Sequence, residues 1–435
     1  GKYSVALLEA GGRNTGSRVV VPGLLAFNMK TPGKLNWGFE TVPQKGLNGR
    51  RGYQPRGKGL GGSSAVNAMV YIRGNRFDYD QWAALGCPGW SYDEVLPWFK
   101  RGEANIRGAS EYHGADGPLH VMDLDHPHAG SREFVAAAEL LQYPANPDFN
   151  GARQEGVGLY QVTQRRGERW SSARAFLDPK PNLSVITGAM VERILFEDGR
   201  AWGVSYTQGG EARVIRARRG VVLAAGAFQT PQLLMLSGIG PAKHLKDHDI
   251  PVLVDRPAVG ANLQDHIDYV ASYEVPGNYF LGQTLVHVAR TARDLIRWFA
   301  SRRGPMTTNY AEAGGFLTVD PASPAPDVQL HFVPAQIEDP SQTLPEMLSA
   351  SVKAFGRRPA LDFFGAVTTY RELGEQVERA AEGLRRLGVG AGDRVALVLP
   401  NCPQHVVAFY AILRVGGIVV EHNPLYTPRE LRHQF

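Results

Sequence analysis

The sequence predicts an α/β protein with more than one domain, and three observations indicate this class. A short apolar run, Val5-Ala6-Leu7-Leu8, ends in Glu9 and precedes two glycines, a pattern typical of a buried parallel strand. A second stretch, at 57–67, is rich in glycine, and a third region, at 369–420, alternates helix-like and strand-like segments. At 435 residues the chain is long enough for two or three domains.

Composition limits the classes of partner. Lys and Arg number 47 against 42 for Asp and Glu, a net charge of +5 that is mild for this length, so we expect no nucleic-acid ligand. The two cysteines, Cys87 and Cys402, lie far apart, which gives no disulfide framework and no metal-binding spacing. Because no signal peptide and no apolar run of about 18 residues is visible, we expect a cytoplasmic protein without a membrane span. The cysteine spacing gives no reason to expect a metal site.

Glu9 stands at the end of its strand. In a dinucleotide-binding fold, an acidic residue there hydrogen-bonds the adenosine ribose, and an ordinary solvated carboxylate is the alternative. The first strand of such a fold and its Gly-x-Gly-x-x-Gly turn would lie upstream of residue 1. Since Glu430–Phe435 also reads as the start of a helix, we expect the chain to be a piece of a longer protein.

The glycine-rich stretch reads Gly57-Lys58-Gly59-Leu60-Gly61-Gly62-Ser63-Ser64-Ala65-Val66-Asn67. Glycine lets the backbone turn tightly and approach a ligand, and successive N–H groups in such a loop form an anion-binding concavity. A helix start after the loop would add a positive dipole end. These properties suit a diphosphate, although many such loops are only turns and Ser64 alone would also fit a helix cap.

Between these motifs and the C-terminal region the sequence predicts further elements. Ser91 and Glu94 predict a capped helix. Strand-like runs at 183–186, 191–196, 203–206 and 213–217 are punctuated by Asp198-Gly199 and Gly209-Gly210, which predict hairpin turns. Residues 221–226 then predict a buried strand that enters a second glycine turn.

A helix is predicted across 285–303. One face would carry the apolar side chains of Leu285, Val288, Ala292, Leu295, Ile296 and Phe299. The other side would carry Arg290, Arg293, Arg297, Arg302 and Arg303. One interpretation is a surface helix packed on the core, and the other is peripheral contact with an anionic membrane at its inner face.

Beyond a proline-rich stretch at 318–345, a new α/β unit begins. Thr369 and Glu372 form a capping box that opens a helix closed by Gly388. Its apolar positions at helical spacing are Leu373, Val377, Ala380, Ala381, Leu384 and Leu387. A strand at 395–399, a helix at 405–414 and a strand at 418–420 are expected to follow.

Three long motifs carry a family resemblance. The glycine-rich loop continues as Tyr71-Ile72-Arg73-Gly74-Asn75-Arg76-Phe77-Asp78, a second motif begins Gly226-Ala227-Phe228-Gln229-Thr230-Pro231 and runs to Gly240, and a third is Val259-Gly260-Ala261-Asn262-Leu263-Gln264-Asp265-His266. Together they resemble the glucose–methanol–choline (GMC) oxidoreductases, flavoproteins that oxidise alcohols, and most nearly the choline dehydrogenase branch, over residues 1–338. The resemblance implies an FAD-binding Rossmann-like domain, N-terminally truncated, with an α+β substrate domain.

The resemblance also implies a cofactor site. It places Glu9 at the adenosine ribose, Gly57, Gly61, Gly62 and Ser63 at the diphosphate and ribityl group, and Asn67, Ala68, Met69 and Val70 beside the isoalloxazine. Val191, Ala225 and Gly226 would lie on the adenine side, and Asn262, Asp265 and His266 near the flavin, although His266 alone would equally suit a structural role. Because Ala65-Val66-Asn67 lacks the histidine that binds FAD covalently in some relatives, noncovalent FAD is expected.

The implied reaction is hydride transfer from the CH–OH carbon of a primary alcohol, choline-like or aliphatic, to flavin N5. The resemblance favours a quinone or dye-type electron acceptor. In the family the catalytic histidine lies in a C-terminal segment that this sequence does not contain, so no catalytic residue is assigned. Neither His113 nor His331 stands in a motif that supports that role.

Residues 342–435 resemble the beginning of AMP-forming acyl-CoA synthetases. The matching motifs are Leu344–Leu348, Thr369–Leu373, Gly392–Ala396, Val415–Val420 and Asn423–Leu431. The expected organisation is a GMC oxidoreductase part at 1–338, a junction at 339–343 and a partial adenylate-forming segment at 344–435. A fragment of a long-chain fatty-acid–CoA ligase and a catalytically inactive fusion are the alternative functions.

Overall fold

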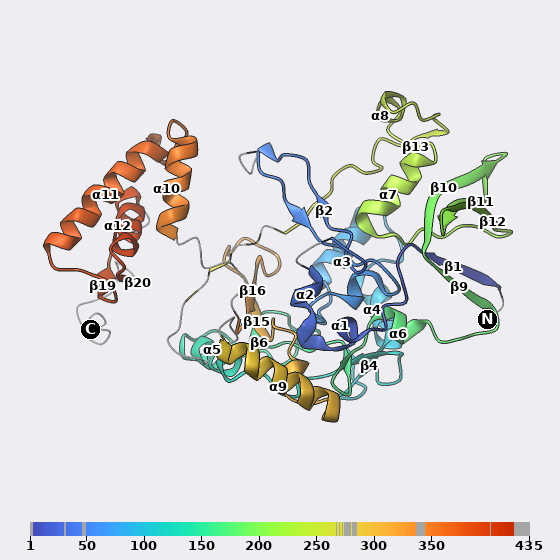
Figure 1. Ribbon diagram of the computed structural model, residues 1–435, viewed down its shortest axis with the longest axis horizontal. Coiled ribbons are helices and arrows are strands. Elements are labelled where there is room, and N and C mark those ends of the chain that lie inside the picture. The colour runs from blue at the N-terminus through green and yellow to red at the C-terminus, as the bar shows by residue number, and fades with distance from the viewer. Residues whose placement is uncertain are drawn as a thin grey trace. The chain divides into compact units, whose positions relative to one another are not determined.

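The computed structural model describes residues 3–29, 32–45, 49–266, 268, 270, 271, 273, 280, 285–335, 344–400 and 402–421 (Figure 1). Its contacts divide the chain into two compact units, Gly1–Gln336 and Ile337–Phe435. Both units mix helices with strands, so the α/β class is confirmed. Across the described parts of the chain, no helix combines the length and the apolar character needed to cross a bilayer. The expected junction at 339–343 lies outside the described residues.

The first strand, β1 (Val5–Glu9), pairs in parallel with β9 (Leu183–Thr187), and Glu9 lies opposite Thr187. The strand is less buried than predicted, since Val5 is 51% exposed. Three further strands, β10 (Ala189–Glu197), β11 (Arg200–Gln208) and β12 (Glu211–Arg216), form an antiparallel meander. Its turns at 198–199 and 209–210 have positive φ at both central residues, which confirms the two predicted hairpins.

The predicted strand at 221–226 is wrong. These residues form no strand, and the Val222 side chain is 92% exposed. A strand needs a neighbour for its backbone hydrogen bonds, and the described sheet at this place contains only β1 and β9. The apolar run therefore leads without a pairing partner into α7 (Gly226–Leu236), which packs beside β10 (Figure 1). The short elements β13 (Ile239–Gly240), α8 (Ala242–Asp247) and β14 (Val254–Asp255) follow.

Short elements precede, include and follow the glycine-rich loop along the chain. They are α1 (Ser17–Val20), η1 (Pro22–Leu24), α2 (Ala26–Met29), β2 (Phe39–Glu40), β3 (Tyr53–Gln54), η3 (Gly62–Ala65), α3 (Arg76–Ala84) and α4 (Tyr92–Gly102). The capping box predicted for α4 is confirmed, because the Ser91 hydroxyl and backbone N–H both donate to the Glu94 carboxylate, at 2.6 and 3.1 Å. The loop therefore lies among turns and short helices, outside any regular sheet.

A second antiparallel sheet has the order β16 (Val328–Phe332), β15 (Ala313–Leu317), β6 (Gly156–Leu159). The helix α5 (Ala129–Leu140) packs on β6 and β15. The remaining elements are β4 (Glu103–Asn105) paired in parallel with β5 (Leu119–Val121), the hairpin β7 (Gln164–Arg165) and β8 (Glu168–Arg169), α6 (Ser172–Phe176) and η4 (Pro305–Thr307). A small core of Met69, Met122 and Val162 joins the loop region to these elements.

The helix α9 spans Leu285–Ser301 and confirms the predicted helix, but it buries a different face. Trp298 is buried beside Met306, and its indole N–H donates to the Gly167 carbonyl at 2.8 Å. Three side chains of the predicted inward face are exposed by 53–71%: Val288, Ile296 and Phe299. The prediction is wrong for these three residues, whereas Leu295 of the same face packs against the cluster that contains Trp298. The large Trp298 ring, which needs both burial and an acceptor, sets the rotation of the helix. The Leu285 side chain lies outside the described part.

The second unit contains α10 (Leu344–Phe355), β17 (Pro359–Phe363), β18 (Ala366–Thr369), α11 (Tyr370–Arg386), β19 (Arg394–Leu397), α12 (Pro403–Arg414) and β20 (Ile418–Glu421). The strands β19 and β20 pair in parallel across α12, so the predicted strand–helix–strand order is confirmed. The Thr369–Glu372 capping box is also present at the start of α11. Leu373 and Val377 pack with Leu348 in the core of this unit.

Candidate functional site

The glycine-rich loop folds into a tight cradle. Gly59, Gly61 and Gly62 have φ of +121°, +91° and +51°, a region that other residues rarely adopt. A Cβ on Gly57 would overlap the backbone carbonyl of Gly62, and a Cβ on Gly59 would overlap the Asn14 side chain. Asn14 Nδ2 in turn donates to the carbonyl of Lys58 at 3.1 Å. The glycines are therefore required by this backbone path.

Glu9 joins the end of β1 to the cradle. One oxygen of its carboxylate, Oε1, accepts hydrogen bonds from the backbone N–H of Gly11 at 2.8 Å and of Gly59 at 2.9 Å. Within the described chain, no hydrogen bond reaches the other oxygen, Oε2. The carboxylate thus fixes the loop with one oxygen and keeps the second for another donor.

The segment after the cradle is held from several sides. Met69 is fully buried with a φ of +59°, and its N–H donates to Asn67 Oδ1 at 3.0 Å. The carbonyl of Ala68 accepts from Asn309 Nδ2 at 2.9 Å, and that of Met69 accepts from the Thr163 N–H at 2.8 Å. A buried residue with a positive φ is strained, so this path is imposed by its surroundings. Ser63 and Asn67 are exposed, which leaves one side of the segment open.

Arg169 on β8 lies under this segment and is 1% exposed. Its Nη1 donates to the carbonyls of Ser64 and Asn67 at 3.2 and 2.7 Å and to Asn67 Oδ1 at 3.0 Å. Its Nε donates to the Val19 carbonyl at 3.0 Å, and its buried Nη2 has no partner within the described residues. Burial lowers the pKa of Arg169 to about 10. Sequence reasoning did not identify this residue, since it lies about a hundred positions from the loop.

Some of the remaining predicted segments contact the loop or the residues beside it, and others do not. Phe228, in the first turn of the helix that starts at Gly226, lies under the Arg56 guanidinium at 4.4 Å, and Arg56 directly precedes Gly57. Asp265 Oδ2 accepts from Gln54 Nε2 at 3.4 Å. Val191 pairs with Tyr206 in the meander. No hydrogen bond or ion pair among the described residues joins the loop to Val191, Ala225, Asn262 or His266.

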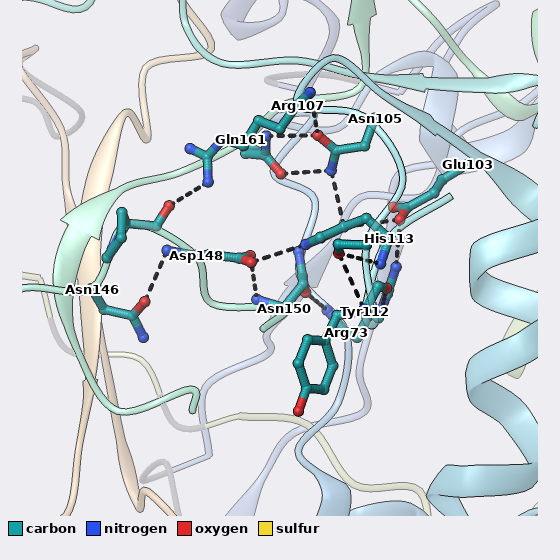
Figure 2. A network of polar contacts seen from close by, with 12 residues as sticks. Arg73, Glu103, Asn105, Arg107, Tyr112, His113, Asn146, Asp148, Asn150 and Gln161 are labelled. Carbon is teal, nitrogen blue, oxygen red and sulfur yellow. Dashed lines mark hydrogen bonds and ion pairs between the residues drawn. The ribbon is translucent and has the colours of Figure 1, made fainter. Parts of the chain in front are cut away.

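A separate polar network surrounds His113 (Figure 2). The fully buried Glu103 accepts from His113 Nδ1 at 2.9 Å and from the Gly114 N–H at 2.9 Å, and Arg73 Nη2 forms an ion pair with it at 2.8 Å. His113 Nε2 lies 2.9 Å from Asp148 Oδ2. Hydrogen bonds to Asp148 and Glu103 raise the pKa of His113 to about 9. Two carboxylates therefore hold a protonated histidine, and the two cations of this network face its two anions.

A cavity of about 300 Å³ lies beside this network. It is lined by Arg73, Arg76, Tyr92 and Tyr112 together with residues of 149–155 and 318–326. No residue of 57–70 lines it, so the cavity is separate from the cradle. His331, on β16, places its ring 5.5 Å from that of Tyr160, and among the described residues no hydrogen bond or ion pair joins it to the cradle.

The residues of the cradle fit a dinucleotide. Three observations support this fit. The glycine path has no room for a Cβ, the strand-end carboxylate of Glu9 has one oxygen without a hydrogen bond among the described residues, and the buried Nη2 of Arg169 has no partner there. Each of these groups matches a part of such a ligand: a glycine path lets a diphosphate approach the backbone, a carboxylate suits ribose hydroxyls, and a cation suits an anionic partner.

Comparison with known proteins agrees with this geometry. Residues 6–268 match the family model of the GMC oxidoreductases, and residues 348–435 match that of the AMP-binding enzymes. The chain is 45% identical over 341 residues to an alcohol dehydrogenase [acceptor] of Pseudomonas putida, covering 77% of this chain and 62% of that protein. It is 42% identical over 344 residues to an oxygen-dependent choline dehydrogenase of Rhizobium etli, covering 78% and 61%. The chain thus spans about three fifths of the length of these relatives.

Solved structures give the same result. A pyridoxine 4-oxidase from Mesorbium loti is 31% identical, with a TM-score of 0.56 over 59% of this chain and 51% of that one. An FAD-dependent oxidoreductase from Chaetomium thermophilum is 27% identical, with a TM-score of 0.63 over 88% of this chain and 65% of that one. The chain therefore belongs to the GMC oxidoreductase family, and its C-terminal residues form a segment that matches the AMP-binding enzymes.

Proposed function

We propose that this protein is an FAD-dependent oxidoreductase that oxidises the CH–OH group of a primary alcohol, either choline-like or aliphatic. FAD is the cofactor that the GMC oxidoreductases use. The observation that carries the proposal is the hydrogen bond from the Gly59 N–H to Glu9, which joins a strand-end carboxylate to a glycine cradle. The names of the relatives, an alcohol dehydrogenase and a choline dehydrogenase, support the alcohol as substrate.

We assign the cofactor contacts as follows. Glu9 would bind the adenosine ribose through its free oxygen, and the backbone of Gly57, Gly61, Gly62 and Ser63 would bind the diphosphate and ribityl group. Asn67, Ala68, Met69 and Val70 would lie along the isoalloxazine. Val191, Ala225 and Gly226 would contact the adenine side, and Asn262, Asp265 and His266 would lie toward the flavin. Bound FAD would accept the hydride of the alcohol, while these residues bind and orient it.

The cofactor is proposed to be noncovalent. The stretch Ala65-Val66-Asn67 offers no histidine, and Ala65 and Val66 are buried. Neither side chain could form a bond to a flavin ring, since both are hydrocarbons. Denaturation of the loaded protein should therefore release all flavin into the supernatant.

The electron acceptor is proposed to be a quinone or a dye-type acceptor. The relatives differ on this point, because one is named for an unspecified acceptor and the other for oxygen. Parallel assays with a quinone, a redox dye and dissolved oxygen, each with choline and with an aliphatic primary alcohol, would separate these choices.

We also propose a cytoplasmic protein that contacts the inner face of the membrane through α9. Val288, Ile296 and Phe299 form a solvent-facing apolar row on this helix, and Arg297 and Arg303 lie near them. An apolar row flanked by cations suits the interface of an anionic bilayer. Co-sedimentation with anionic vesicles at low salt, lost at high salt and in Ile296→Asp, is the expected result.

The organisation is proposed to be an oxidoreductase part at 1–338, a junction at 339–343 and a partial adenylate-forming segment at 344–435. The βαβ unit of β19, α12 and β20 and the match to AMP-binding enzymes support the last part. If the C-terminal segment alone carried the function, the chain would transfer acyl groups with ATP and CoA. An inactive fusion would show neither that activity nor alcohol oxidation.

The test is FAD binding by the full chain and by Glu9→Gln. We expect the wild-type chain to take up FAD, with quenched flavin fluorescence, and to reduce a dye when alcohol is added. Glu9→Gln should weaken FAD binding about 10-fold to 150-fold, because a carboxylate bond to a ribose hydroxyl contributes about 1.5–3 kcal/mol. Glu40→Gln, at an exposed position, is the matched control. A wild-type chain that takes up no FAD would contradict the proposed function.

A further inference from the structure

Arg169 is a buried cation without a buried anion. Its side chain is 1% exposed, and no ion pair among the described residues includes it. The adjacent carboxylate, Glu168, is already paired with Arg174 at 2.7 Å and with Arg302 at 3.0 Å. Burying a charge without a partner is costly, and proteins that retain such a charge commonly use it at a functional site.

The contacts of Arg169 all lead to the loop and its support. Nη1 binds the carbonyls of Ser64 and Asn67 and the Asn67 side chain, and Nε binds the carbonyl of Val19 in α1. The amide hydrogen bonds that define the turn, from Val66 and Asn67 to the Ser63 carbonyl, measure 3.1 and 2.8 Å. The guanidinium thus binds the carbonyls of the turn at Ser64–Asn67. The amide hydrogen bonds of the same turn set the path of the segment that follows, 68–70.

We propose that Arg169 is a positioning residue of the cofactor site, which fixes the turn at Ser64–Asn67 and places an uncompensated positive charge behind the segment expected beside the isoalloxazine. The inference rests on the proposed function for the cofactor and deepens it. A flavin gains negative charge when it is reduced, so a nearby buried cation stabilises the reduced form over the oxidised form. Arg169 therefore both orders the binding segment and raises the reduction potential of the flavin.

Charge and geometry are separable by substitution. Arg169→Gln removes the charge and keeps one side-chain amide donor group, whereas Arg169→Lys keeps the charge and loses the planar fork that reaches three acceptors. Arg165→Gln is the matched control, because Arg165 lies on the same hairpin, is exposed and loses the same charge. The measurements are FAD affinity, the reduction potential of the bound flavin, and hydrogen–deuterium exchange of residues 63–70 in the full chain.

We expect Arg169→Gln to bind FAD about 10-fold to 100-fold more weakly, as the loss of charge-assisted hydrogen bonds implies, and to lower the reduction potential. In Arg169→Lys the reduction potential of the bound flavin should stay close to the wild-type value, but residues 63–70 should exchange faster than in the wild-type chain. Arg165→Gln should match the wild-type chain in all three measurements. If Arg169→Gln fails to fold, Arg169→Lys provides the test. The proposal is overturned if Arg169→Lys exchanges at the wild-type rate at residues 63–70. It is also overturned if the flavin bound to Arg169→Lys has a reduction potential as low as that of free flavin.

The proposal is also overturned if Arg169→Gln keeps the wild-type affinity, potential and exchange. That result is distinct from failure of the proposed function, in which the wild-type chain would bind no FAD. In that case both roles assigned to Arg169 fall with the cofactor.

Discussion

Arg73 and Arg169 are 5% and 1% exposed, but the two guanidinium groups have opposite surroundings. Arg73 forms an ion pair with Glu103 at 2.8 Å, and Glu103 in turn binds His113. Burial lowers the pKa of Arg73, yet Tyr71 and Glu103 outweigh this effect and the net shift is upward. Burial alone acts on Arg169, and its pKa falls to about 10. One buried cation is neutralised within the chain, and the other is not.

This difference indicates that Arg73 has a structural role and that Arg169 has a role at the proposed cofactor site. At Glu103, His113 and Asp148 each charge faces an opposite charge, and this network fixes the chain (Figure 2). A buried charge that is bound only to carbonyl oxygens is not neutralised by an anion. The positive charge of Arg169 therefore acts on the neighbouring glycine cradle. The two regions should therefore respond in opposite ways to substitution and to FAD.

The largest expected effect is on stability, from Glu103→Gln. This change leaves Arg73 and His113 as buried cations without their shared anion, so we expect the free energy of unfolding to fall by about 3–5 kcal/mol. All seven tryptophans lie in residues 1–336, so tryptophan fluorescence during urea unfolding reports on this unit alone. Glu211→Gln, which breaks an exposed pair with Arg213, should leave the transition nearly unchanged. Similar midpoints for both variants would contradict the account of the network.

The second effect is the pH dependence of stability. The pKa of His113 rises from 6.5 to about 9 on folding. A raised folded pKa gives stability that is complete below 6.5 and is lost as pH rises through about 9, in total up to about 3 kcal/mol. Unfolding midpoints measured from pH 6 to pH 10 should fall in that window, and His113→Gln should flatten the curve. A flat wild-type curve would show that His113 is neutral in the folded chain.

The third effect concerns the cradle. In Gly57→Ala the new methyl would overlap the backbone of Gly62, and such overpacking costs about 1–3 kcal/mol and distorts the loop. We expect FAD affinity to drop about tenfold or more while the network around His113 stays intact. Gly33→Ala is the control, because Gly33 is exposed and a Cβ there meets nothing within 4 Å. Equal FAD titration curves for the two variants would count against the cradle as the cofactor site.

The smallest effect is that of Asp148→Asn. Asp148 is partly exposed, and its hydrogen bond is the first cause of the raised pKa of His113. The substitution should move the upper end of the pH window downward and destabilise the unit by about 1 kcal/mol at neutral pH, with FAD binding unchanged. The pH titration of His113 by NMR checks this directly, and an unshifted titration would assign the raised pKa to Glu103 instead.

Local sequence signals predicted the elements well, because caps, turn glycines and alternation act over a few residues. The capping boxes at Ser91 and Thr369, the hairpin turns at 198 and 209 and the strand–helix–strand order at 394–421 are all present. Burial was harder to predict: Val222 and Ile296 are exposed because pairing partners and helix rotation are set by distant residues. Arg169 could not be identified at all, since its role depends on contacts across about a hundred positions.

The most direct test of the account is hydrogen–deuterium exchange of the wild-type full chain with and without FAD. We predict that FAD slows exchange at residues 57–70, and less strongly at 9–12, while residues 103–114 around His113 exchange at the same rate in both conditions. Exchange at 57–70 that does not respond to bound FAD, or FAD-dependent protection at 103–114 in its place, would contradict the central claim that the cradle of Glu9 and the glycine-rich loop holds the cofactor.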